Sequence, residues 1–107
     1  MYKRQVLVKG GHGTGICAED VLFDGEKLSL VSSPRIEQPL STHGTGCSLS
    51  AAITASMACG NDVLTAVVEG KAYVYESIRT GVYVGEVAPV LGTPQRLPVD
   101  QIRIQTL

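Results

Sequence analysis

The segment with the clearest capacity for chemistry is the run STHGTGCS over residues 41–48, placed where a loop is expected to turn into a helix. Gly44 and Gly46 allow a tight backbone bend that turns successive N–H groups to one side. The first N–H groups of a helix have no intrahelical partner, and the helix dipole adds partial positive charge there. The pattern therefore predicts an anion hole, suited to phosphate oxygens or to charge on a transferring phosphoryl group.

Cys47 follows the second of these glycines and falls in the first turn of the expected helix. Thiols at helix N-termini ionise more readily, and a thiolate here could accept a proton or hold a hydroxyl in line for attack. A cysteine that only fills a small apolar space is the alternative. The run has neither the lysine of a P-loop nor the third glycine of a dinucleotide-binding turn, so its spacing alone predicts an anion-binding helix start and no more.

A second glycine-rich run, KGGHGTG over residues 9–15, follows the apolar run Val6-Leu7-Val8. An unbroken apolar run of this kind is typical of a fully buried parallel strand. Loops at strand ends are where ligands bind in open α/β sheets. Lys9 is then either a point charge for a phosphate at such a loop or a solvated lysine that ends the strand.

The helices expected to position these loops have clear local signals. Small and apolar residues at helical spacing predict one helix from Gly44 to Gly60. The pair Asn61-Asp62 supplies an N-cap for a second helix that ends near Gly81. A glycine in mid-helix costs about 1 kcal/mol relative to alanine, so Gly70 predicts a close packing contact within this second helix.

The remaining segments are assigned by their turn and breaker residues. Residues 20–24 and 27–32 are predicted to form two short strands joined through Asp24-Gly25-Glu26, because Asp-Gly is a strong hairpin signal. Residues 1–5 resemble the translation of a sequencing adapter and are predicted to be a scar, with an ordinary polar N-terminus as the alternative. Residues 86–107 carry three prolines and lose any period, so they are predicted to form a largely irregular tail.

Composition limits the class of protein. A chain of 107 residues with 44% hydrophobic content is one domain or a piece of one. The formal net charge of −1 gives no electrostatic case for nucleic acid or an anionic membrane. The apolar stretches are too short for a membrane-spanning helix. Three cysteines without a CxxC pair favour free thiols in a reducing, cytoplasmic setting.

The runs VLVKGGH over residues 6–12 and THGTGC over residues 42–47 together closely resemble the C-terminal half of the hydroxymethylpyrimidine/phosphomethylpyrimidine kinases of thiamine biosynthesis. The resemblance covers residues 6–89, in the order strand, KGGH loop, hairpin, STHGTGC and two helices. It implies an α/β fold, the C-terminal portion of a ribokinase-like three-layer α/β/α sandwich with a mostly parallel sheet and a β-hairpin. Sugar kinases and many pyridoxal kinases carry aspartate where Cys47 stands, so the cysteine favours the pyrimidine branch.

The activity that the resemblance implies is transfer of the γ-phosphoryl group of ATP, with magnesium (Mg²⁺), onto hydroxymethylpyrimidine and then onto its monophosphate. Cys47 would be the catalytic base or the group that orients the hydroxyl. The anion hole would be formed by Gly44, Thr45, Gly46 and the Cys47 amide. The nucleotide side of the cleft would be formed by Lys9, Gly10, Gly11, His12 and Thr42. His43 is either a further phosphate contact or an ordinary loop residue, and no motif predicts a metal site.

Several alternatives remain open. The domain would run over residues 6–85, and the family builds its pyrimidine pocket mainly from an N-terminal half that is absent here. The chain alone is therefore expected to lack kinase activity and to aggregate or associate, whereas the parent enzyme would be a homo-oligomer. A pyridoxal kinase, a non-catalytic phosphate-binding module and a small interaction protein are the other interpretations. Tyr73 and Tyr75 with Lys71 could form an adenine shelf or simply pack on their helix.

Overall fold

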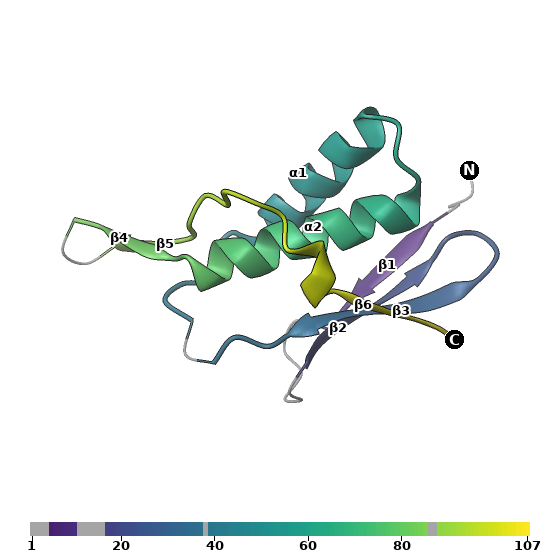
Figure 1. Cartoon of the computed structure of the whole chain (residues 1–107), viewed down its shortest axis with the longest axis horizontal. Helices are drawn as coiled ribbons and strands as arrows, with labels where there is room; N and C mark the ends of the chain where they lie inside the picture. Colours follow the sequence, from purple (N-terminus) through teal and green to yellow (C-terminus); the bar gives the residue numbers. More distant parts are fainter. Residues whose placement is uncertain (1–4, 11–16, 38, 86–87) are drawn as a thin grey trace.

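The computed structural model describes residues 5–10, 17–37, 39–85 and 88–107 of the chain. Within these ranges, six short strands and two long helices follow one another (Figure 1). These elements are β1 (Val6–Lys9), β2 (Cys17–Phe23), β3 (Leu28–Pro34), α1 (Thr45–Ala58), α2 (Val63–Arg79), β4 (Val82–Val84), β5 (Ala88–Val90), the 3-10 turn η1 (Val99–Gln101) and β6 (Arg103–Thr106). Both helices lie on the same side of the main sheet (Figure 1).

The main sheet has the strand order β1-β2-β3-β6, and each of its ladders is antiparallel. The prediction of a mostly parallel sheet is therefore wrong for the strands that the structure describes. A parallel pair needs a crossover of about a dozen residues or more, and only residues 10–16 separate β1 from β2. The run Val6-Leu7-Val8 forms the edge strand of the described sheet, with Val6 42% and Val8 61% exposed, so its predicted burial is not found within this chain.

The predicted hairpin is confirmed by the pairing of β2 with β3. Gly25 has a φ of 106°, a left-handed conformation that glycine adopts without steric cost. The carboxylate of Asp24 accepts hydrogen bonds from the backbone N–H groups of Glu26 and Lys27, at 2.9 and 3.0 Å. These two donors hold the pKa of Asp24 below its ordinary value, so the turn is stabilised by an ionised side chain.

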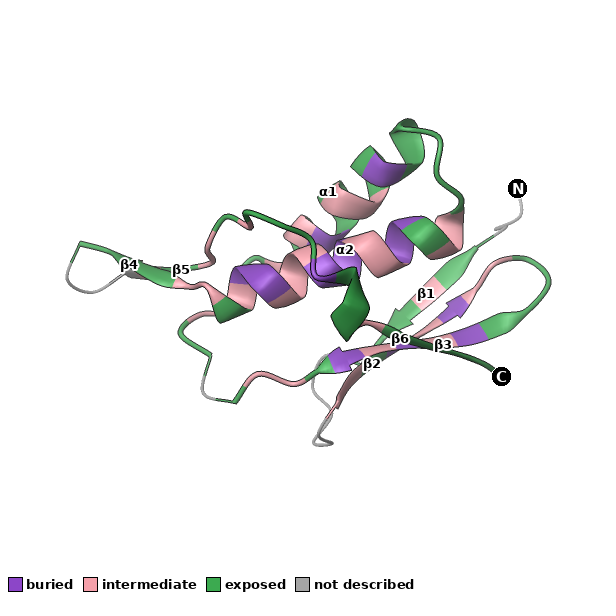
Figure 2. Ribbon diagram, in the orientation of Figure 1, coloured by how far each residue is buried: buried purple, intermediate pink, exposed green. Residues whose placement is uncertain are grey.

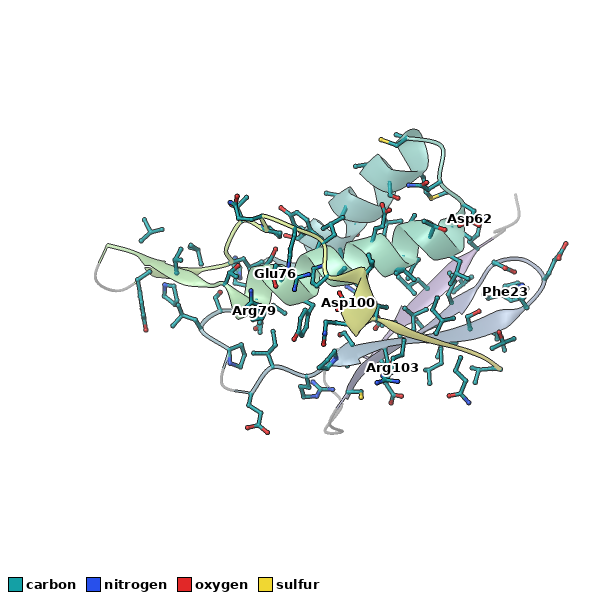
Figure 3. All side chains as sticks on the ribbon, viewed as in Figure 1. Phe23, Asp62, Glu76, Arg79, Asp100 and Arg103 are labelled. Carbon is teal, nitrogen blue, oxygen red and sulfur yellow. The ribbon has the colours of Figure 1, made fainter. Side chains whose placement is uncertain are left out.

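Both predicted helices are confirmed, and so is the role of Gly70. A Cβ on Gly70 would lie 2.8 Å from Cγ1 of Ile53, closer than real side chains approach, so the glycine lets α1 and α2 touch. The α2 N-cap is Asp62, whose carboxylate accepts a hydrogen bond from the Thr65 backbone N–H at 2.8 Å (Figure 3). The helices are thus fixed at their crossing and at the start of α2.

The core lies between α2 and the main sheet. Leu22, Val31 and Val67 form its fully buried cluster, one residue each from β2, β3 and α2. Figure 2 shows this buried stripe on α2 and on the strands beneath it. No described element covers the opposite face of the sheet, where Val6, Val8 and Leu28 are exposed.

The C-terminal segment is more regular than the sequence predicts. The expectation of an irregular tail over residues 86–107 is wrong for β5, which pairs with β4, and for β6, which pairs with β3. Pro98 is buried, and it ends the proline-containing stretch just before η1. The strand β6 forms because the exposed edge of β3 offers it hydrogen-bond partners, and that edge is far away in the sequence.

The remaining expectations concern the cysteines, membrane-spanning helices and the ends of the domain. Cys17, Cys47 and Cys59 are all free thiols. No helix in the described ranges combines the length and hydropathy that crossing a membrane would need. Most of the predicted scar falls outside the described residues, so that assignment stays a prediction, as does the 6–85 domain boundary.

Candidate functional site

The N-terminal end of α1 is open in the way that the glycine-rich run predicts. Gly44 precedes the helix with a φ of 88°, and no side chain caps the helix there. Thr45 N–H reaches the Thr42 carbonyl only at 3.4 Å, beyond the usual hydrogen-bond range. The backbone N–H groups of Gly46 and Cys47 donate to no residue in the described part of the chain. These amides remain available for an anion.

Lys9 reaches this helix start from the end of β1. A Cβ on Gly46 would lie 3.0 Å from the Lys9 Nζ atom, so the ammonium group rests directly against the glycine. Two features that the sequence places far apart are therefore neighbours in space. A positive side chain and unpaired amides at one point favour an anionic ligand such as a phosphate.

A cavity of about 610 Å³ opens beside this point. It is partly open to solvent and is lined by residues of both helices, of β1, β2 and β3, and of the segment that leads from β3 to α1. Its lining includes Lys9, Thr42, Thr45 and Gly46, four of the predicted site residues. The structure therefore gathers part of the predicted anion hole and part of the predicted nucleotide side around one space.

A buried ion pair stands inside the same cavity. The Lys71 ammonium lies 2.9 Å from one carboxylate oxygen of Asp20, and both side chains are less than one-tenth exposed. The other oxygen of Asp20 accepts the Gly10 backbone N–H at 3.0 Å. Gly10 packs so closely on the Glu19 carbonyl that no Cβ would fit there. Asp20 thus fixes the point at which β1 turns into the glycine-rich loop.

Sequence reasoning missed Asp20 and considered Lys71 only as part of an adenine shelf. A signal for Asp20 was present, since it stands two residues before Leu22 and so shares the core-facing side of its strand. A carboxylate at such a position must find a partner. The two tyrosines do not form a shared shelf, because Tyr75 lines this cavity whereas Tyr73 lines a different hollow between α1 and α2, which agrees with the alternative that they pack on their helix.

The remaining predicted site residues are less tightly grouped. Cys47 is exposed at the first turn of α1 and does not line the cavity. Gly44 and His43 are also exposed, and the His43 backbone N–H donates to the Ser41 hydroxyl at 3.2 Å. Gly11 and His12 lie outside the described residues. Within the ranges that are described, no three carboxylate, histidine or cysteine side chains are close enough to hold a metal ion.

Solved structures share this arrangement of strands and helices. Pyridoxal kinase from Staphylococcus aureus, solved with AMP-PCP, superposes with a TM-score of 0.82 at 25% identity, over 97% of this chain and 39% of that chain. An ADP complex of Bacillus subtilis pyridoxal kinase gives a TM-score of 0.74 at 32% identity, over 84% of this chain and 35% of that chain. The fold is that of ribokinase-like small-molecule kinases.

Sequence comparison gives the family within that class. The sequence model described as phosphomethylpyrimidine kinase matches residues 1–91, and the chain belongs to this family. A hydroxymethylpyrimidine/phosphomethylpyrimidine kinase from Rhizobium meliloti is 49% identical over 73 residues, 68% of this chain and 27% of the relative. A pyridoxine kinase from Bacillus subtilis is 39% identical over 74 residues, 69% of this chain and 27% of that relative. The chain thus spans about a quarter of the length of these two relatives.

Proposed function

We propose that the protein transfers the γ-phosphoryl group of ATP to the hydroxyl of hydroxymethylpyrimidine, and in a second step to its monophosphate, on the route to thiamine diphosphate. The observation that carries this proposal is the Lys9 ammonium resting against Gly46, beside the Gly46 and Cys47 amides that donate to none of the described residues. Membership of the phosphomethylpyrimidine kinase family supplies the chemical context. A site of this kind stabilises the charge on the oxygens of the phosphoryl group while that group passes from the nucleotide to the substrate hydroxyl.

Each group at the helix start then has a distinct role. The amides of Gly46 and Cys47 bind oxygens of the transferring phosphoryl group, and Lys9 neutralises part of the charge on the nucleotide phosphates. The substrate hydroxyl oxygen forms a bond to the γ-phosphorus while the bond from that phosphorus to ADP breaks. The hydroxyl proton passes to the Cys47 thiolate, which first holds the hydroxyl in line. Exposure of Cys47 leaves it open to a substrate approaching from outside the cavity.

ATP fits the described residues better than a metal ion does. Lys9, Thr45 and Gly46 share one cavity and present cationic and hydrogen-bonding groups. The described ranges hold no cluster of three metal-ligating side chains. We therefore expect Mg²⁺ to be bound through the nucleotide phosphates, where it neutralises phosphate charge, and we assign none of the described residues to it.

A second candidate is phosphorylation of pyridoxal or pyridoxine at the same site. It is supported by the pyridoxal kinases that share the fold and by the pyridoxine kinase among the sequence relatives. Cys47 is the residue that favours the pyrimidine. Phosphate binding without catalysis is the third candidate, and the absence of Cys47 from the cavity lining is the observation in its favour.

The whole protein is expected to be larger in its working form. The solved kinases extend well beyond the 39% or less of their chains that this sequence covers. We propose that the exposed sheet face, with Val6, Val8 and Leu28, packs against the further layers and parallel strands of a ribokinase-like sandwich. The 107-residue chain alone should then be inactive. A reducing, cytoplasmic setting and a homo-oligomeric parent complete the proposal.

The test places the segment in a complete enzyme. The aligned segment of the Rhizobium meliloti kinase is replaced by this chain, and ATP-dependent phosphorylation of hydroxymethylpyrimidine and of pyridoxal is measured side by side. The proposal expects the pyrimidine to be the better substrate, and the isolated chain to turn over neither. Preference for pyridoxal would favour the second candidate, and turnover by the isolated, monomeric chain would contradict the expected inactivity.

Cys47→Ala in that chimera tests the role of the thiol. Turnover is expected to fall by about 100-fold or more while ATP binding stays, because general acid–base groups contribute on this scale. Cys59→Ala is the matched control, since Cys59 is also exposed but caps the opposite end of α1. If neither variant changes turnover, the thiol has no catalytic role, and phosphate binding alone is the better description of this helix start.

A further inference from the structure

Lys9 and Asp20 face each other directly in the antiparallel ladder of β1 and β2. Facing residues on neighbouring strands have Cβ atoms about 5 Å apart, so opposite charges there normally attract one another. The Lys9 ammonium instead rests against Gly46 at the start of α1. No acidic side chain in the described ranges lies within ion-pair distance of it. Lys9 therefore forms no ion pair with Asp20, although the two residues face each other in the ladder.

The reason lies on α2. Lys71 places its ammonium 2.9 Å from one oxygen of Asp20, and the Gly10 backbone N–H donates to the other oxygen at 3.0 Å. Asp20 and Lys71 are each only 7% exposed. A buried carboxylate strongly attracts any cation within reach unless it is already paired. Because both oxygens of Asp20 have partners, the carboxylate does not need Lys9.

We propose that Lys71 is a positioning residue that keeps Lys9 available for phosphate. It does so by neutralising Asp20, the carboxylate that would otherwise draw the Lys9 ammonium across the ladder and away from Gly46. This inference rests on the proposed function, because it assigns Lys9 to the phosphates of the nucleotide. The inference adds a role for Lys71, which controls the position of Lys9 through Asp20 and does not have to contact the ligand.

A purely structural ion pair would behave differently. Loss of one partner would then lower stability, and the Lys9 side chain would stay where it is. Under the proposal, Lys71→Met leaves Asp20 unpaired and Lys9 moves to it, whereas removal of both charges leaves Lys9 at Gly46. The double variant should therefore recover what the single variant loses.

The experiment uses the chimera in which this chain replaces the aligned segment of the Rhizobium meliloti kinase, with inorganic triphosphate as the probe. Nuclear Overhauser contacts between the Lys9 Hε and Gly46 Hα protons report the position of the lysine, and amide titrations report affinity. Lys71→Met is expected to remove that contact and to weaken binding by about tenfold, the effect of losing one hydrogen bond to a charged group. Lys9→Met should weaken binding equally. The double variant Asp20→Asn/Lys71→Met should restore both the contact and the affinity.

Two further variants separate charge from shape. Lys71→Arg keeps a cation beside Asp20 and is expected to retain the Lys9 contact. Lys27→Met removes an exposed lysine of the hairpin and should leave the affinity unchanged. Asp20→Asn alone keeps an oxygen for the Gly10 N–H and should also leave Lys9 at Gly46.

An unchanged Lys9 contact in Lys71→Met would overturn the proposal. A double variant that binds as weakly as Lys71→Met would also overturn it, because Lys71 would then contact the anion itself. Should Lys71→Met fail to fold, Lys71→Gln makes the same test. If both single variants of Lys71 unfold while the double variant Asp20→Asn/Lys71→Met folds, the Asp20–Lys71 ion pair has only a structural role. An unsubstituted chimera that binds no triphosphate contradicts the proposed function, yet its Lys9 contacts still test this inference.

Discussion

The N-terminal ends of the two helices are built in opposite ways. At α2 the carboxylate of Asp62 accepts the Thr65 backbone N–H at 2.8 Å, so the first turn is closed by its own chain (Figure 3). At α1 the preceding residue is Gly44, with a φ of 88° and no side-chain cap. The ammonium of Lys9 stands beside that start where α2 has a carboxylate.

The difference separates a helix start made for folding from one left open to a ligand. A side-chain cap typically stabilises a helix by about 1 kcal/mol, and α1 does without it. An ammonium group beside a helix N-terminus is also unfavourable on its own, because both carry positive charge. An anion bound between them would remove both costs, which is why the open end is the better candidate site.

Giving α1 a carboxylate is expected to have the largest effect. Gly44→Asp should weaken triphosphate binding by about 100-fold, because a fixed negative charge repels the ligand and its oxygens can occupy the free amides. Calorimetric titration of the chimera with the Rhizobium meliloti kinase measures this. The matched control is Gly60→Asp, which also has a positive φ and open space but lies past the other end of α1. Equal losses in both variants would attribute the effect to backbone strain.

Forcing the two helices apart is expected to be the next largest change. Gly70→Val should lower the free energy of unfolding by about 1–3 kcal/mol, because its side chain would meet Ile53 and Leu49 at contact distances that are already too short. Urea unfolding measures the loss. Triphosphate binding should weaken as well, since α1 would shift relative to Lys9. Ala58→Val, on an exposed position of α1, is the control and should change neither quantity much.

The side-chain cap at the start of α2 should make the stability of the fold depend on pH. Hydrogen bonds from the side chain and backbone N–H of Thr65 hold the pKa of Asp62 below its ordinary value of 3.8. The ionised cap therefore stabilises the fold above that value, and the stabilisation is lost as the pH falls through the lower, folded-state pKa. Asp62→Asn should lower Tm by about 2 °C at neutral pH and by nothing at strongly acidic pH.

Thermal unfolding at a series of pH values measures the effect of Asp62→Asn. Glu26→Gln, an exposed carboxylate of the hairpin, serves as the control. A Tm difference that stays constant down to the lowest pH would mean that the charge of Asp62 does not matter. Neither variant should change triphosphate binding, because neither lies at the start of α1.

Local signals predicted most of the elements around this comparison. Asp24 and Gly25 define the hairpin through their own turn geometry, and Asp62 defines the start of α2 through a bond only three residues long. Gly70 was predictable because a mid-helix glycine needs a packing reason. Each of these features depends on residues that are close in the sequence or, for Gly70, on the energetic cost of a glycine within a helix.

Features that depend on distant partners were not predictable in the same way. Asp20 and Lys71 are 51 positions apart in the sequence, and no local sequence signal around either residue predicts that they pair. The strand β6 needs the edge of β3, and the unbroken apolar pattern of β1 did not reveal its antiparallel pairing with β2. The meeting of Lys9 with Gly46 likewise depends on how α1 packs beside the sheet.

The most direct test of the central claim is a titration of the chimera with inorganic triphosphate, followed through the backbone amide resonances of this segment. We expect the amides of Gly46 and Cys47 to shift most, together with the Lys9 side chain, while the capped Thr65 amide at the start of α2 stays in place. Shifts spread evenly over the surface, or a response at α2 without one at α1, would contradict the assignment of this helix start as the phosphate site.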